Sequence, residues 1–96
     1  MSSETMRRIR EFVRQHPTSG NQHVVYDMTG ENIWKIVASG ENIVKALEIL
    51  LTAEHSIISN ITVDSTGKGY IIPLQYTLGN IRSGVYTYNA DKHTLE

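Results

Sequence analysis

Ninety-six residues leave room for one hydrophobic core, because a second domain would have to be built from fewer than about fifty. The apolar share of 40% fits a folded chain, and a formal charge of −1 provides no overall field toward nucleic acid or membranes. The absence of cysteine excludes disulfides, Cys-ligated zinc, iron–sulfur clusters and thiol nucleophiles. We expect a single domain over residues 1–96, with a polar tail from about residue 90 and no cofactor.

The two ends of the sequence carry no signal of export. Residues 1–14 are polar and arginine-rich, without the apolar segment of a secretory signal, and no apolar run approaches the length of a membrane span. We therefore expect a cytoplasmic protein with no membrane partner. The pair Leu95-Glu96 often precedes a purification tag, so we interpret it as a candidate vector-derived remnant and give it no functional weight.

The first predicted element is a helix that begins at Ser2 or Ser3 and ends near Gln15. Its apolar residues recur at spacings of three and four and form one face: Met6, Ile9, Phe12 and Val13. Pro17 then ends the helix, because a proline pushes the residue before it out of the α region. The pattern is that of an amphipathic surface helix.

A predicted hairpin and a second helix follow. Residues 23–28 and 33–38 have strand-like alternation and β-branched content, and the short turn 29–32 between them forces antiparallel pairing. An apolar stripe at helical spacing then predicts a helix over about 41–54.

The second half of the chain is predicted to be mostly strand. Residues 57–64 alternate in character, the turn 65–69 reverses the chain, and 70–76 forms the return strand. Pro73 cannot donate to a ladder, which indicates an edge position or a bulge. A last strand is expected over 85–89.

These elements predict an α+β fold in the order α-β-β-α-β-β-β. The apolar stripes of the two helices need a common partner, so both should pack on one face of an antiparallel sheet of about five strands. No strand has the continuous apolar run that is typical of a parallel sheet buried on both faces.

The N-terminal helix suggests a nucleic-acid-binding surface as one functional alternative. Four of the nine basic residues fall in eight consecutive positions: Arg7, Arg8, Arg10 and Arg14. Arginines of this kind contact phosphates without reading sequence. Glu4 and Glu11 offset them, and the net charge is low for a nucleic-acid domain, so this alternative is not favoured.

Catalytic and metal-binding patterns are absent from the sequence. The four histidines have no ligand spacing: His16, His23, His55 and His93. Residues 64–69 combine glycine, lysine and hydroxyls but lack the order of a phosphate loop and fit a hairpin turn. A small enzyme whose site is invisible in sequence remains a second alternative.

The leading hypothesis is a small non-catalytic regulatory or protein-interaction domain that self-associates, with a homodimer as its simplest form. An open sheet leaves edge strands and an uncovered face, and both are natural recognition surfaces. We expect the interface to use aromatic and apolar strand residues, namely Trp34, Ile58, Tyr70, Tyr76, Tyr86 and Tyr88.

Overall fold

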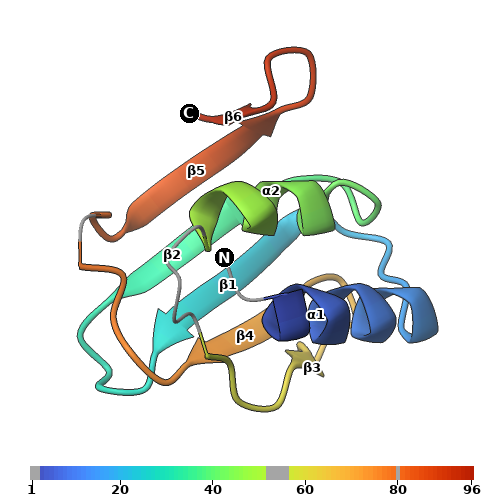
Figure 1. Ribbon diagram of the computed structural model, residues 1–96. Coiled ribbons are helices and arrows are strands. Elements are labelled where there is room, and N and C mark those ends of the chain that lie inside the picture. Colours follow the sequence, from blue (N-terminus) through green and yellow to red (C-terminus); the bar gives the residue numbers. More distant parts are fainter. Residues whose placement is uncertain (1–2, 52–56, 80) are drawn as a thin grey trace.

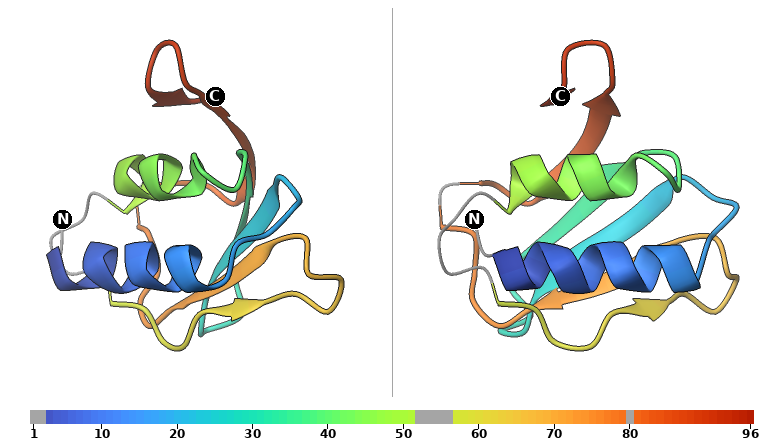
Figure 2. Two further views of the ribbon diagram at one scale, coloured as in Figure 1. Left: turned by 90° about the vertical axis from the view of Figure 1, so that its right-hand side faces the viewer. Right: turned by 45° about the vertical axis from the view of Figure 1, so that its right-hand side comes forward.

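A computed structural model describes residues 3–51, 57–79 and 81–96. Its elements are α1 (Ser3–Gln15), β1 (Gln22–Asp27), β2 (Ile33–Val37), α2 (Ile43–Leu50), β3 (Thr62–Val63), β4 (Tyr70–Leu74), β5 (Gly84–Asn89) and β6 (Thr94–Leu95). Both helices lie on one face of a six-stranded sheet, and no described helix or strand covers the other face (Figures 1 and 2). The fold is α+β, and none of its described helices is long and apolar enough to span a membrane.

The sheet is mixed and has six strands, which corrects the expectation of five antiparallel strands. The order is β3-β4-β1-β2-β5-β6. β1 and β2 form the expected antiparallel hairpin, but β4 runs parallel to β1 and β5 runs parallel to β2. Parallel strands are usually buried on both faces and lose their alternation. Here only one face is covered, so buried and exposed side chains alternate along β1 and β2 as they do in antiparallel strands.

Three element boundaries differ from the prediction. The strand expected over 57–64 is reduced to β3 and a single bridge between Ile58 and Leu74. α2 ends at Leu50, and residues 52–54 of the expected helix lie outside the described residues. The expected polar tail contains β6, which pairs with β5 and places Leu95 against the core.

The core lies between the two helices and the covered face of the sheet. α2 contributes its whole buried stripe, Ile43, Ala46, Leu47 and Leu50. The sheet contributes Val25, Trp34, Ile36 and Ile72, each no more than 1% exposed. Burial of a large apolar side chain stabilises the fold by roughly 1.5 to 3 kcal/mol, so this layer holds the helices in place.

Replacing Leu47 with alanine should lower the free energy of unfolding by about 2 to 5 kcal/mol, because it leaves a cavity between α2 and the sheet. Lys45 lies on the exposed side of the same helix, and Lys45→Ala is the matched control, expected to change stability by less than about 0.5 kcal/mol. Urea denaturation measures both. Similar losses in the two variants would contradict this orientation of α2.

Pro73 lies inside the sheet, where a proline was expected only at an edge or a bulge. β4 has β1 on one side and the segment containing Ser59 on the other, and the Ser59 N–H donates to the Pro73 carbonyl at 2.8 Å. The N and C=O of a strand residue point to the same side, so proline leaves the Ser59 carbonyl without its usual ladder donor. The Arg8 guanidinium donates instead, to the carbonyls of Ile58 at 2.9 Å and Ser59 at 3.3 Å. An arginine of α1 therefore completes the ladder that proline interrupts.

Replacing Arg8 with methionine should lower the free energy of unfolding by about 1 to 2 kcal/mol, because two carbonyls lose a charged donor. The matched control Arg7→Met removes only an exposed ion pair with Glu4 and should cost less than about 1 kcal/mol. In a Pro73→Ala background, Arg8→Met should lower the free energy of unfolding by less, because alanine has an N–H that can donate to the Ser59 carbonyl. Urea denaturation of the four variants gives the coupling, and equal costs in both backgrounds would refute the compensation.

Candidate functional site

Two of the arginines proposed as phosphate contacts are neutralised on their own helix. Arg7 pairs with Glu4, and Arg14 pairs with Glu11, each with an N–O distance of 2.6 Å. The hydrogen bond from Arg7 lowers the pKa of Glu4, and the one from Arg14 lowers the pKa of Glu11. Both carboxylates therefore stay charged beside their arginines.

The other two arginines of α1 also have partners. Arg10 faces Glu48 of α2 at 3.8 Å, and Arg8 holds the carbonyls of Ile58 and Ser59. Three of the four arginines thus face a glutamate, and the fourth, Arg8, donates hydrogen bonds to backbone carbonyls beside β4. The arrangement gives the nucleic-acid alternative no added support, and that alternative stays an untested prediction.

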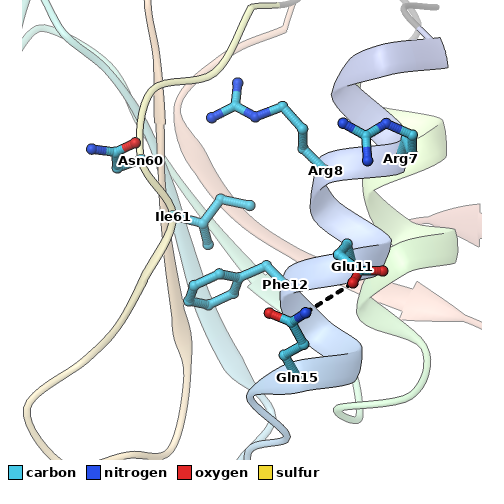
Figure 3. Close-up of a pocket in the computed structure, with 7 residues that line it drawn as sticks. All are labelled: Arg7, Arg8, Glu11, Phe12, Gln15, Asn60 and Ile61. Atoms are coloured by element: carbon cyan, nitrogen blue, oxygen red, sulfur yellow. Dashed lines mark hydrogen bonds between the residues drawn. The ribbon is translucent and has the colours of Figure 1, made fainter.

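A groove of about 350 Å³ runs between α1 and the segment 60–61. Figure 3 shows Phe12 and Ile61 facing each other at its apolar base, with polar side chains of α1 along the wall. Glu11 on that wall accepts from Gln15 at 2.8 Å as well as from Arg14. The groove combines an apolar base with polar groups that already bond one another.

Phe12 is not free to act as a stacking platform for bases. Its ring packs against His16 at a centroid distance of 4.4 Å and meets Tyr70 edge-on at 6.0 Å. These contacts are those of a half-buried residue packed against the core, which agrees with the place of Phe12 on the apolar face of α1.

The histidines lie in separate places. His16 stacks on Phe12 at the end of α1, and His93 contacts the Tyr88 hydroxyl at 2.9 Å in the β5–β6 turn. His23 is fully buried in β1, while His55 falls outside the described residues. Within the described ranges, no three His, Asp or Glu side chains are placed to hold a metal ion.

His23 is held between two backbone groups. Its Nε2 lies 3.0 Å from the Ala38 carbonyl, and its Nδ1 accepts from the Tyr70 N–H at 3.1 Å. This requires a neutral ring with the proton on Nε2. Burial lowers the pKa of His23, partly offset by the bond to the Ala38 carbonyl and by the charge of Asp64.

A second buried polar group is Asp27 at the end of β1. Its carboxylate accepts from the Thr29 hydroxyl and from the Asn32 amide at 2.8 Å. These bonds outweigh burial and lower the pKa of Asp27 to about 2. Asn32 also donates to Thr77 and accepts from Ser83, at 3.1 and 3.2 Å. The cluster links the β1–β2 turn to the chain that leads into β5. The spacing Asp-x-Thr-x-x-Asn is the one feature of the sequence that could have indicated it.

Five of the six residues expected at an interface lie in the core or on the covered side of the sheet. Trp34, Tyr70 and Ile58 are at most 2% exposed, so a single copy of the chain does not present these side chains at its surface. The strand register places Tyr86 opposite Ile36, on the covered side of the sheet, and Tyr88 shares that side. Both are half-buried.

Tyr76 alone of the expected interface residues is well exposed, at 63%. It lies just beyond β4 and outside the strand register, so it adds to no continuous face. If the uncovered face of the sheet binds a partner, the side chains that make the contact are therefore other than those expected from the sequence.

The uncovered face is built from the alternate strand residues. We define the open face as the side chains of Gln22, Val24, Tyr26, Ile33, Lys35, Val37, Ile71, Val85 and Thr87. Ile33 and Val85 are 50% and 63% exposed, and the other aliphatic members are half-buried. Apolar side chains thus lie on four neighbouring strands. Among the elements that the structure describes, both helices lie on the opposite face of the sheet (Figure 2).

Comparison of the chain with protein-family models, with curated proteins and with solved structures finds no match in any of the three.

Stability should fall as the pH is lowered through about 6.5, the pKa of an ordinary histidine. Because the pKa of buried His23 is lower than this, the unfolded chain takes up a proton that the folded chain does not. The contribution is fully present above pH 6.5 and is lost progressively below it. His23→Gln should flatten this dependence, whereas His93→Gln at the exposed turn should keep it.

Urea denaturation at about pH 7.5, 6.5 and 5.5 measures the dependence for all three chains. Equal slopes in the wild type and in His23→Gln would show that His23 does not carry it.

Proposed function

We propose that this chain is a non-catalytic protein-interaction domain that docks a protein partner on the open face. The observation that supports this proposal is the exposure of a contiguous apolar surface on the sheet. Contiguous apolar patches on folded domains commonly mark interaction sites. Ile33 and Val85 are each at least half exposed, and half-buried aliphatic residues connect them across β1 and β2.

The strand pairing strengthens the proposal. β1 and β2 each have one parallel neighbour, and sheets built entirely of parallel strands carry a layer on both faces. In this chain α1 and α2 supply only one layer (Figure 2). A partner that supplies the second layer would bury surface that a single copy leaves in water, at roughly 25 cal/mol per Å².

The polar clusters favour binding over chemistry. The carboxylate of Asp27 and both ring nitrogens of His23 are committed to bonds within the fold. Each is fully buried, so neither meets a substrate at the surface. Their hydrogen bonds hold the strand ends together, and this structural role accounts for both residues without a catalytic one.

A displayed library of random peptides, panned against the chain, should enrich sequences that bind the wild type and fail to bind the double variant Ile33→Lys/Val85→Lys. The variant places two charges in the apolar surface, so docking there should be lost. The control Ser19→Lys/Ser65→Lys adds the same charge at exposed positions away from the sheet face and should keep binding.

Self-association, expected from the sequence, is tested alongside by sedimentation equilibrium at micromolar concentration. A dimer that Ile33→Lys/Val85→Lys dissociates would make a second copy the partner. A monomer whose enriched peptides bind both double variants equally would refute the proposed function of the open face.

A further inference from the structure

The open face contains one charge, and that charge lies at its centre. Lys35 is the middle residue of β2, flanked across the strands by Val24 and Val85 and along its own strand by Ile33 and Val37. Within β1, β2, β4 and β5 the strand register places no other charged side chain on this face, and Lys35 forms no ion pair with any described residue. Glu96 lies on the same side at the outer edge, where it is paired with Thr87 through the backbone and lies 3.9 Å from the Lys92 ammonium group. An apolar surface with a single central cation calls for a complementary anion.

This placement disfavours a second copy as the occupant. A two-fold axis through the face would bring the two Lys35 ammonium groups toward each other, since the surface must be self-complementary. Like charges brought together in a desolvated interface cost several kcal/mol. The same lysine keeps the isolated face from pairing with itself, as charges on exposed strands commonly do.

The covered face shows what kind of element suits this sheet. There the amphipathic helices α1 and α2 pack on the sheet (Figure 2), and Met6 and Ile9 of α1 are buried. Five-residue strands give a face about 17 Å long, which is the length of roughly eleven helical residues. A helix of that size with an apolar stripe would complete a helix–sheet–helix arrangement.

We infer that the open face binds an amphipathic helix of a partner protein, and that this helix presents a carboxylate to Lys35. The inference rests on the proposed function and names the partner of the same surface. Apolar residues of the helix cover Ile33, Val85 and Val24, while its Asp or Glu pairs with the ammonium group. The pair sets the register of the helix on the face, and the apolar contacts supply most of the affinity.

The test uses three synthetic amphipathic helical peptides of about fourteen residues, which differ only at the centre of the leucine face, where they carry Glu, Gln or Lys. Each is titrated into the isotope-labelled chain and followed by amide chemical shifts. We expect the Glu peptide to shift amides of β1, β2 and β5, with affinity about fivefold above the Gln peptide, and the Lys peptide to bind most weakly. Lys35→Glu should reverse the order of the Glu and Lys peptides.

The matched control is Lys45→Glu, which makes the same charge change on the exposed side of α2 and should leave the order unchanged. An order that Lys35→Glu does not alter, shifts confined to the groove beside α1, or no shifts at millimolar peptide would each overturn the inference. These outcomes are separable from failure of the proposed function. Library peptides that need the open face but ignore Lys35, or a dimer dissociated by Ile33→Lys/Val85→Lys, would uphold the docking surface and reject the acidic helix.

Discussion

The layered structure depends on one buried contact, the stacking of His23 on Tyr70 at a ring-centroid distance of 5.3 Å. His23 bonds the carbonyl of Ala38 after β2 and the N–H of Tyr70 at the start of β4, so one ring joins three chain segments. The Tyr70 hydroxyl donates to the His16 carbonyl at 2.5 Å and thereby fastens the end of α1 to the same point. Without these partners, backbone groups at the ends of two strands would be buried without hydrogen bonds, which proteins rarely tolerate.

In β1, residue type alone does not indicate which face of the sheet is covered. By residue type alone, Val24 and Tyr26 make the more apolar face of β1, yet they lie on the open side. The covered side holds His23, Val25 and Asp27, all fully buried. Burial of the two polar residues is possible because each has hydrogen-bond partners within the fold. The apolar residues that remain outside form the surface on which the functional proposal rests.

The sequence predicted the local elements and missed what depends on distant contacts. The spacing of Met6, Ile9 and Phe12 placed the first helix correctly, and the short turn after β1 fixed the antiparallel hairpin. Parallel pairing with β4 and β5 has no local pattern when only one face is buried. Pro73 indicated an edge because the sequence cannot show that Arg8 replaces its missing donor. Trp34 was expected at an interface because alternation divides a strand into two faces and does not say which one meets the helices.

The position of the β1–β2 hairpin at the centre of the sheet has a consequence for synthesis. Its outer neighbours, β4 and β5, both come from the second half of the chain. While the chain is being made, the hairpin emerges with both long edges unpaired, and such edges are templates for pairing with other chains. Neither edge can be closed locally, because the partners are distant in sequence and their pairing is slow to form. The sheet therefore cannot be completed on the ribosome before β5 has emerged, and a nascent chain that ends before β5 leaves the outer edge of β2 unpaired.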